Sequence, residues 1–240
     1  MSKTAAIVQS NYIPWRGYFD LIDRVDTFVL YDCVQYTRRD WRNRNRIKTP
    51  RGLRWLSIPV VNRGRYDQSI EDTEVASKDW AERHTAQIEA SYSGAAGFAA
   101  HGGWLAAALR EAARSSRLTE INELLLRRIC ERLGLDADKI CRTSNFFPSE
   151  ALMAQDRTAR MVWLCQAAGA KTYLTGPSAR AYLDEAQFAE AGIQVEWMTY
   201  PDYPAYPQPW GVFEPQLSIV DLLLCVPDRH IDYIRSGRAV

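Results

Sequence analysis

Residues 5–31, AAIVQSNYIPWRGYFDLIDRVDTFVLY, hold the pattern that decides the fold. The run Ala5–Gln9 is apolar and suits a buried strand, and the loop after it carries a proline and a glycine. Apolar side chains then recur at helical spacing from Tyr18 to Val25, and the β-branched and aromatic run Thr27–Tyr31 follows. A strand, a helix and a second strand in this order predict two parallel strands joined by a right-handed crossover.

The same order of elements returns near the other end of the chain. Arg157–Ala168 has a helical pattern that ends at a glycine, and Lys171–Thr175 has the pattern of a strand. The turn Gly176–Ser178 suits the start of a helix that runs to about Ala191, and the alternation of Ile193–Trp197 is that of a half-buried strand. These βα units predict an α/β fold built on a parallel, Rossmann-like sheet.

The middle of the chain is predicted to be helical. Three segments with apolar residues at helical spacing cover Lys78–Tyr92, Phe98–Ser115 and Leu118–Leu133. A further apolar helix is expected around Leu217–Cys225. We therefore expect one α/β domain over residues 1–240, with a helical insertion or subdomain at about 78–145.

The composition is that of an ordinary soluble globular protein, with 47% apolar and 25% charged residues. No apolar run approaches the roughly 20 residues that cross a bilayer, and no signal-peptide pattern opens the sequence. Five cysteines are scattered without CxxC spacing, and the three histidines are far apart. The sequence thus predicts a cytoplasmic protein with reduced thiols and no membrane span, and it does not predict a histidine-rich metal site.

Residues 38–55 carry the most unbalanced charge of the chain. This stretch contains eight basic side chains against one acid, Asp40, so its net charge is +7, whereas the whole chain carries only +1. Seven of the eight are arginines, whose planar guanidinium matches phosphate and carboxylate oxygens two at a time. A nearly neutral chain that gathers its cations in one segment is expected to bind an anionic ligand there.

Three interpretations of this basic stretch stay open. In the first, Arg42, Arg44 and Arg46, helped by Asn43 and Asn45, bind a phosphorylated small molecule such as a nucleotide sugar or the phosphopantetheine arm of a carrier. In the second, nearby aromatic rings stack the bases of RNA or DNA between cations, although the net acidic remainder of the chain argues against nucleic acid. In the third, the stretch is an ordinary solvated basic face.

Polar side chains also follow the first two predicted strands, where parallel α/β sheets bind ligands. Gln9, Asn11 and Tyr18 belong to the first strand-to-helix turn, which matches neither the GxGxxG nor the Walker A pattern. Asp32, after the second strand, could bind a sugar hydroxyl or act as a general base. Cys33 beside it could be a nucleophile, but we favour a small buried residue at this position.

Candidate residues continue into the next segments. Gln35 and Tyr36 follow the second strand and lead directly into the basic stretch. His84 lies on the inward stripe of the Lys78–Tyr92 helix, where it is either a core residue or a general base, because the pKa of histidine can reach neutrality.

Two later loops supply the remaining candidates. Gly176 and Ser178 place backbone amides and a hydroxyl at another strand-to-helix junction. Tyr206 and Gln208 lie in the proline-stiffened loop Tyr200–Pro209, which is either a stacking platform for a sugar or base, or a strap over the core.

Taken together, these segments resemble the WbqC-like family. The resemblance spans nearly the whole chain, and its most specific part is the run Arg42–Asn45. The matching segments are Ile7–Asp20, Phe28–Tyr36, Asp40–Lys48, Trp55–Pro59, Tyr173–Gly176, Tyr206–Gln208 and Leu217–Leu222, with the spacing of Trp80, His84 and Tyr92. The chain departs from the family pattern at Cys33, where the family usually has a second acid. This departure puts in doubt any mechanism that needs two carboxylates there.

The resemblance implies a role in the biosynthesis of O-antigen, lipopolysaccharide or another surface polysaccharide. It implies a transferase that forms an amide by moving an activated acyl or aminoacyl group, with glycine as the family-level candidate, onto a nucleotide-linked sugar. In this hypothesis His84 or Asp32 deprotonates the attacking amine, and backbone amides near Gly17 or Gly176 bind the oxyanion. No bound cofactor is expected, and the donor would be an adenylate or a thioester on an acyl or aminoacyl carrier protein.

Two other functions stay open at this point. One is an ATP-dependent enzyme that activates a carboxylate as an adenylate, and the other is a non-catalytic RNA- or DNA-binding module. The sequence leaves open the donor, the acceptor, the oligomeric state, the metal dependence and which arginines face the site.

Overall fold

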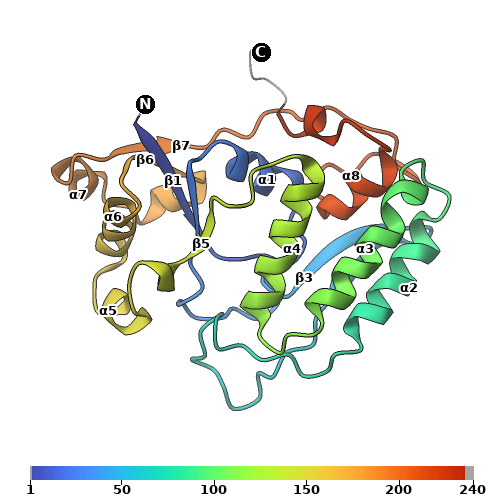
Figure 1. The fold of residues 1–240 in the computed structure, drawn as a ribbon, viewed down its shortest axis with the longest axis horizontal. Coiled ribbons are helices and arrows are strands. Elements are labelled where there is room, and N and C mark those ends of the chain that lie inside the picture. The colour runs from blue at the N-terminus through green and yellow to red at the C-terminus, as the bar shows by residue number, and fades with distance from the viewer. Residues whose placement is uncertain (1, 236–240) are drawn as a thin grey trace.

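The computed structural model describes residues 2–235, and Figure 1 shows its fold. Within these residues five parallel strands form the main sheet, in the spatial order β5-β2-β1-β6-β7. The strands are β1 (Lys3–Val8), β2 (Thr27–Leu30), β5 (Ile140–Arg142), β6 (Ala170–Thr175) and β7 (Gln194–Trp197). The predicted α/β fold with a parallel, Rossmann-like sheet is confirmed.

Both faces of the sheet are covered, because alternate side chains of each strand enter different hydrophobic cores. In β2, Phe28 and Leu30 join the larger core, whereas Val29 joins the smaller one. In β1, Ala6 faces the larger core and Ile7 the smaller. This double burial explains why the strands read as nearly continuous apolar runs in the sequence.

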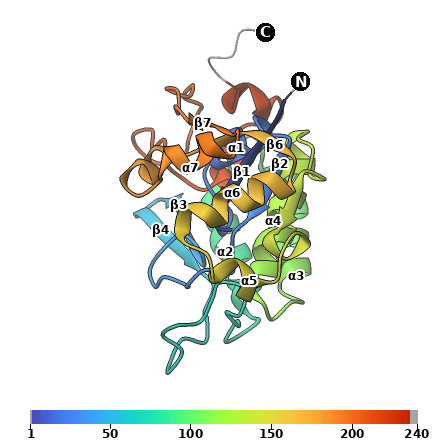
Figure 2. The same ribbon diagram turned by 90° about the vertical axis from the view of Figure 1, so that its left-hand side faces the viewer.

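The helices divide between these two faces. The larger core is packed by α1 (Arg16–Asp23), α2 (Trp80–Tyr92), α3 (Phe98–Ala112), α4 (Leu118–Leu133) and α8 (Ile219–Cys225). The smaller core is packed by α5 (Ser149–Met153), α6 (Arg157–Ala167) and α7 (Glu185–Glu190). Figure 1 shows these groups to the right and left of the sheet, and Figure 2 shows α6 lying across the second face.

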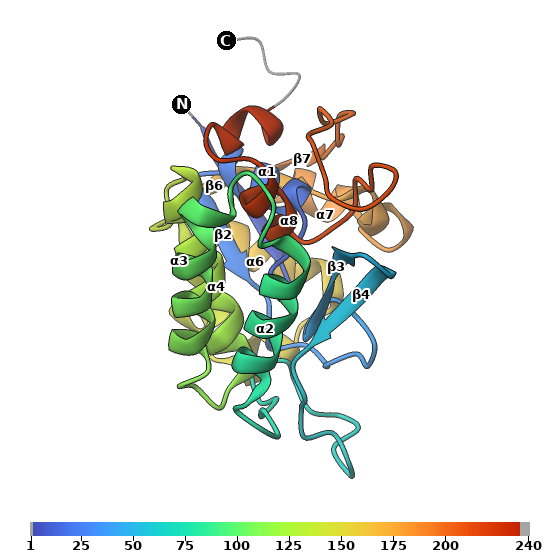
Figure 3. The same cartoon turned by 90° about the vertical axis from the view of Figure 1, so that its right-hand side faces the viewer.

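A two-stranded antiparallel hairpin stands apart from the main sheet. It consists of β3 (Arg44–Thr49) and β4 (Gly52–Ser57), and its turn uses Gly52 in the left-handed region at φ +98°. Figure 3 shows the hairpin beside α2 and below α8. The basic stretch therefore folds into a hairpin, a feature that the sequence analysis did not anticipate.

Three short 3₁₀ helices complete the described elements: η1 (Thr143–Asn145), η2 (Pro177–Ala181) and η3 (His230–Tyr233). The helix expected from Ser178 to Ala191 is wrong as a single element, because η2 and α7 are separated by residues 182–184. A new N-cap causes this break, since the side chain of Asp184 accepts a hydrogen bond from the Ala186 backbone.

The segment predicted as a helical insertion contains α2, α3 and α4 and also ends in β5, which pairs with β2 in the main sheet. Within residues 2–235, none of the helices combines the length and the apolar character that a membrane crossing requires.

The connections of the sheet place a crevice at the end of β1. Chain segments that leave β1 toward β2 and β5 run over the larger core, whereas those that connect β5 to β6 and β6 to β7 run over the smaller core. Strand β1 therefore lies between neighbours whose crossovers take opposite faces. In open α/β sheets ligands bind at such a switch point, outside the carboxyl ends of the strands.

Candidate ligand-binding site

Arg42 fixes the side chains of the first turn. Its guanidinium donates to Gln9 Oε1 at 2.6 Å and to Asn11 Oδ1, and it lies 3.5 Å from a carboxylate oxygen of Asp40. A charged donor that holds two amide oxygens at once restricts both side chains to single positions. The structure thus brings together three residues that the sequence analysis proposed for the site, and Arg42 is the residue that organises them.

The backbone of the same turn adopts a strained conformation. Ile13 has φ +38°, a region that β-branched residues rarely enter, and it is fully buried. Its carbonyl accepts hydrogen bonds from Asn45 Nδ2 at 2.9 Å and from Ser218 Oγ at 2.7 Å. Strain of this kind costs about 1–3 kcal/mol and persists only where the surroundings enforce it. Here β3 and the start of α8 enforce it from two sides.

Trp15 covers the start of α1. A Cβ atom at Gly17 would lie only 2.3 Å from the indole Cζ2 of Trp15, so the absence of a side chain at this position lets the ring lie flat there. The ring of Tyr200 packs against the same indole with centroids 5.1 Å apart. Gly17 is therefore a packing requirement for the Trp15 ring.

These residues surround a cavity of about 250 Å³ beyond the carboxyl end of β1, which we call the first cavity. Its lining consists of two indoles, three amide side chains and a proline: Trp15, Trp41, Asn11, Asn45, Gln216 and Pro14. Flat apolar rings combined with amide donors and acceptors suit a ligand with hydroxyl groups on an apolar ring face. The lining contains no titratable side chain.

Trp41 connects the first cavity to a row of stacked cations and rings on the outer face of the hairpin. The Arg46 guanidinium lies 5.8 Å from the Trp41 ring centroid and 5.7 Å from that of Trp55, and Arg44 lies 4.1 Å above Trp55. The two indoles have centroids 5.3 Å apart, and each is about 40% exposed. We call these four residues the Arg–Trp face.

Neither arginine of this face forms an ion pair within residues 2–235, although the charge of Arg44 helps to lower the pKa of Asp40. Of the eight basic side chains in residues 38–55, only Arg42 forms an ion pair within the part of the chain that the structure describes. Arg54 is directly opposite Ile47 in the hairpin, so strand alternation places it on the other face from Arg46 and Trp55. The Arg–Trp face thus presents two guanidinium groups beside an aromatic cavity.

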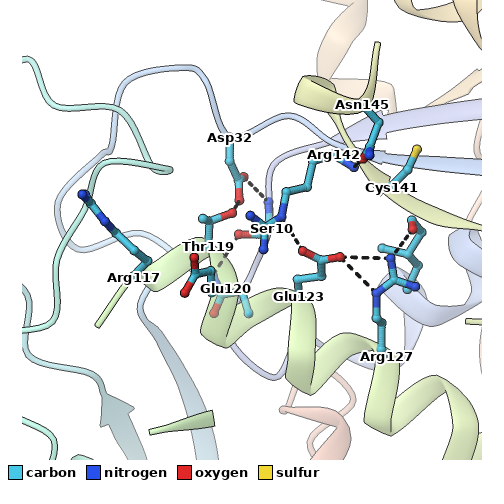
Figure 4. Close-up of polar contacts among 12 residues, drawn as sticks. Ser10, Asp32, Arg117, Thr119, Glu120, Glu123, Arg127, Cys141, Arg142 and Asn145 are labelled. Carbon is cyan, nitrogen blue, oxygen red and sulfur yellow. Dashed lines mark hydrogen bonds and ion pairs between the residues drawn. The ribbon is translucent and has the colours of Figure 1, made fainter. Parts of the chain in front are cut away.

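Asp32 holds α4 against the ends of β1 and β2. Its carboxylate is buried and accepts hydrogen bonds from the Ser10 backbone at 2.8 Å and from Thr119 Oγ1 at 2.5 Å (Figure 4). Burial raises the pKa of Asp32, and the hydrogen bonds partly oppose this rise. Asn122 extends the network, since its amide donates to Ser10 Oγ and to the Arg42 carbonyl. Both carboxylate oxygens are occupied, which argues against a general-base role.

A second polar cluster on α4 lies nearby. Glu123 accepts hydrogen bonds from Arg127 at 3.0 Å and from Arg142 at 2.5 Å, as Figure 4 shows. The Glu123–Arg142 ion pair joins α4 to the end of β5, whereas the Glu123–Arg127 pair lies within the helix. Together with Asp32, the Glu123–Arg142 pair fixes the helix relative to three neighbouring strands.

His84 occupies the core between the first turn and the hairpin. It is buried, its Nδ1 lies 2.8 Å from the Tyr12 hydroxyl, and it also forms a hydrogen bond with the Ser57 backbone. Burial lowers the pKa of His84 to about 4. His84 does not line the first cavity. This placement favours the core interpretation over the general base.

Tyr206 and Gln208 bind a buried carboxylate instead of facing a cavity. Tyr206 Oη and Gln208 Nε2 donate to Asp221 at 2.9 and 2.7 Å, and Tyr92 Oη donates to the same group at 2.6 Å. Lys48 Nζ donates to Gln208 Oε1 at 3.1 Å. This network holds the loop to α2, α8 and β3, which favours the interpretation of the loop as a strap over the core.

The remaining candidates lie apart from the first cavity. Tyr18 is buried and donates to the Gln9 carbonyl, whereas Gln35 is exposed and donates to the Tyr66 carbonyl. Gly176 lies near Tyr200, and Ser178 is exposed on η2. Burial raises the pKa of the Cys33 thiol to about 11, so it has no thiolate character near neutrality.

Sequence reasoning did not select Trp15, Trp41 or Gln216 as lining residues of the first cavity. Trp15 lies in the first turn and Trp41 in the basic stretch, where the sequence analysis considered nearby aromatic rings only as stacking partners for nucleic-acid bases. Gln216 carries no such signal, because only the fold brings its segment to the first turn, through the hydrogen bond of the Ile219 backbone to the Pro14 carbonyl. Within residues 2–235 no group of three or more His, Cys, Asp or Glu residues could hold a metal ion.

The sequence matches the WbqC-like protein family over residues 9–233. The chain belongs to this family. A relative from Mycobacterium tuberculosis (strain ATCC 25618 / H37Rv), the uncharacterized protein Rv1507c, is 48% identical over 236 residues, covering 98% of this chain and 99% of the relative. No solved structure matches the chain. The family resemblance seen in the sequence is thereby confirmed, and both the first turn and the Arg–Trp face lie inside the matched region.

Proposed function

We propose that this WbqC-like protein is a transferase that forms an amide by moving an activated acyl or aminoacyl group, such as glycyl, onto a nucleotide-linked amino sugar in surface polysaccharide biosynthesis. The observation that carries the proposal is the continuity of the first cavity with the Arg–Trp face through Trp41. One end of the site suits a sugar ring, and the other end suits a diphosphate.

The volume and lining of the first cavity support this assignment. Ligand pockets commonly measure roughly 300–1,000 Å³, so a cavity of about 250 Å³ holds one ring of a sugar nucleotide and not the whole molecule. In the proposal the indoles stack on the sugar ring, the amides of Asn11 and Gln216 bind its hydroxyls, and the diphosphate lies along Arg46 and Arg44.

In the proposed reaction no side chain of the first cavity transfers a proton, because its lining contains no titratable group. The sugar amine, as the free base, attacks the carbonyl carbon of a thioester; a C–N bond forms, the C–S bond breaks, and the amine proton passes to the leaving thiolate. The protein contributes by holding the amine and the carbonyl in reacting geometry, which can supply several kcal/mol of the barrier. Asp32 and His84 hold the walls of the site and take no proton in this mechanism.

A matched pair of variants tests the assignment of the acceptor. Arg46→Ala removes a cation from the Arg–Trp face, whereas Arg54→Ala removes one from the opposite face of the same hairpin. Since a hydrogen bond to a charged group contributes about 1.5–3 kcal/mol, Arg46→Ala should weaken the binding of uridine or thymidine diphosphate sugars at least about tenfold in calorimetry. Arg54→Ala should leave the affinity nearly unchanged, and equal losses in both variants would contradict the assigned face.

Turnover is tested by intact-mass analysis of sugar nucleotides incubated with the protein and glycyl thioesters. The expected product is an amino-sugar nucleotide that has gained one glycyl unit. A panel in which amino sugars bind but are never acylated by any thioester or by glycine with ATP would remove the transferase proposal.

The Arg–Trp face also favours a second candidate function, the binding of single-stranded nucleic acid. Exposed indoles that alternate with guanidinium groups resemble the stacking platforms of such proteins. This candidate predicts tight binding of oligonucleotides that weakens steeply with salt and is lost in Trp55→Ala, without binding of sugar nucleotides. Titration of both ligand classes with the same protein separates the two functions.

A further inference from the structure

A second cavity lies at the other end of the Arg–Trp face. Its volume is about 480 Å³. Its lining comes from three separate segments and consists of Tyr36, Arg38, Arg39, Asn43, Arg44, Ser57, Ile58, Pro59, Val60 and Asn62. Arg44 belongs both to this cavity and to the Arg–Trp face, so it stands between the two cavities.

The charge of this cavity is strongly positive. Three of its lining residues are arginines and none is an acid. Within residues 2–235 none of the three forms an ion pair. Three unpaired guanidinium groups at one concave surface create a site for an anion with several oxygen atoms, such as a phosphate ester.

Backbone carbonyls hold two of the three arginines of this cavity. Arg38 donates to the Asn62 carbonyl at 3.0 Å, and Arg44 donates to the Arg39 carbonyl. Burial raises the pKa of the Tyr36 phenol, while the charges of Arg44 and Arg38 lower it. Tyr36, Arg38 and Arg44 all belong to the lining of this cavity, and both positive charges act on the phenol.

The lining also has an apolar part, formed by Ile58, Pro59 and Val60, which continue the chain beyond β4. A lining with both cationic and apolar residues suits a ligand whose phosphate is attached to a long uncharged portion. Inorganic phosphate would use only half of such a surface.

We propose that the second cavity binds a second phosphate ester, the activated donor, at the same time as the first cavity binds the acceptor. This inference rests on the proposed transferase function. Arg44 would then contact the phosphates of both substrates, and the Arg–Trp face would set the distance between the two. The donor phosphate can belong to the pantetheine arm of a thioester or to an adenylate, since both present the same anionic group.

The test combines three variants with two classes of ligand. The donor probes are coenzyme A, 4′-phosphopantetheine and AMP, and the acceptor probe is the sugar nucleotide that binds most tightly. Arg38→Ala should weaken the donor probes about tenfold and leave the acceptor unchanged, because an exposed charged contact is lost at one cavity only. Arg46→Ala should do the reverse, and Arg44→Ala should weaken both. Arg51→Ala, at the tip of the hairpin, removes one cation from a position that lines neither cavity.

The two ligand classes should also bind together, so that a saturating acceptor leaves the dissociation constant of the donor probe within about twofold. Competition between them would reduce the two cavities to one site and overturn the inference. Equal losses of donor-probe affinity in Arg38→Ala and Arg51→Ala would show only a general attraction of anions and would also overturn the inference. The failure of all donor probes to bind would overturn it as well. A preference for phosphopantetheine over AMP identifies a thioester donor, and the reverse identifies an adenylate.

These results separate the two proposals. Donor probes that bind through Arg38 without any binding of sugar nucleotides would support the second cavity and remove the proposed acceptor. Sugar nucleotides that bind through Arg46 without any binding of donor probes would support the acceptor site and remove the second cavity.

Discussion

At the scale of single residues, Gly17 shows how a position without a functional group can determine a ligand site. The Trp15 indole lies where a Cβ atom would be, and the same indole forms a wall of the first cavity. Gly17→Ala must move that ring, although alanine is otherwise favoured over glycine in a helix by about 1 kcal/mol. The substitution is therefore not expected to lower the stability of helix α1.

We expect Gly17→Ala to weaken sugar-nucleotide binding about tenfold and to change the near-ultraviolet circular dichroism of the tryptophans, while the far-ultraviolet spectrum stays the same. Gly94→Ala is the control, since a Cβ atom there meets nothing within 4 Å. An unchanged affinity in Gly17→Ala would mean that the position of Trp15 does not matter for binding.

At the scale of elements, the contact of α3 with α8 depends on another glycine. A Cβ atom at Gly97 would lie 2.5 Å from the Val226 carbonyl oxygen and 2.7 Å from that of Leu223, and the Gly97 amide donates to the Leu224 carbonyl at 2.9 Å. The start of α3 thus packs directly on the last carbonyls of α8. Backbone atoms cannot rotate away as a side chain would.

Gly97→Ala should therefore lower the free energy of unfolding by about 1–3 kcal/mol, as overpacking usually does. The control is Gly103→Ala on the same helix, where a Cβ atom meets nothing and the substitution should stabilise by about 0.5–1 kcal/mol. Urea denaturation measures both, and a neutral Gly97→Ala would show that the two helices can separate at little cost.

At the scale of the whole molecule, His84 links stability to pH. Its contacts join α2, the first turn and the end of the hairpin, and burial lowers its pKa from 6.5 to about 4. Below pH 6.5 the unfolded chain takes up a proton that the folded protein does not accept. The stability contributed by neutral His84 is thus fully present above pH 6.5 and is lost as the pH falls toward 4, by roughly 3 kcal/mol.

His84→Gln should remove this part of the pH dependence. Buried Asp32 and Asp221 act in the opposite direction, because their raised pKa values let the folded protein bind protons more readily than the unfolded chain. The measurement is therefore the difference between the wild type and His84→Gln in unfolding free energy, followed from pH 7.5 to about 4.5. A difference that does not change with pH would mean that His84 titrates normally in the folded state.

The sheet could be predicted from the sequence because its strands carry a local signal. Buried on both faces, β1 and β2 read as apolar runs, and turns with proline or glycine bound them. The hairpin had no such signal, because Arg44, Arg46 and Lys48 alternate with only one fully apolar partner, Ile47. Its inner residues pack against a loop and helices that are distant in sequence, so tertiary contacts decide that it is a strand pair.

The site shows the same limit at the level of side chains. The sequence marked Gln9, Asn11 and Arg42 as candidates, and the structure brings them into direct contact. In the structure Arg42 is held by amide side chains, whereas Arg44 and Arg46 lie near indole rings. The sequence alone could not distinguish these three arginines, because they are identical in type and evenly spaced. Only the start of β3 at Arg44 fixes which of them face outward.

The separation of the hairpin from the main sheet has a consequence for how relatives diverge. Arg44 and Arg46 are partly buried and Trp55 is exposed, whereas Asn45 and Ile47, which alternate with the two arginines, are buried. Substitutions at Arg44, Arg46 and Trp55 can thus change which ligand a relative binds with little effect on the stability of its fold. Substrate preference across the family should therefore follow the residues equivalent to Arg44, Arg46 and Trp55, while the inward positions stay constrained whatever the substrate is.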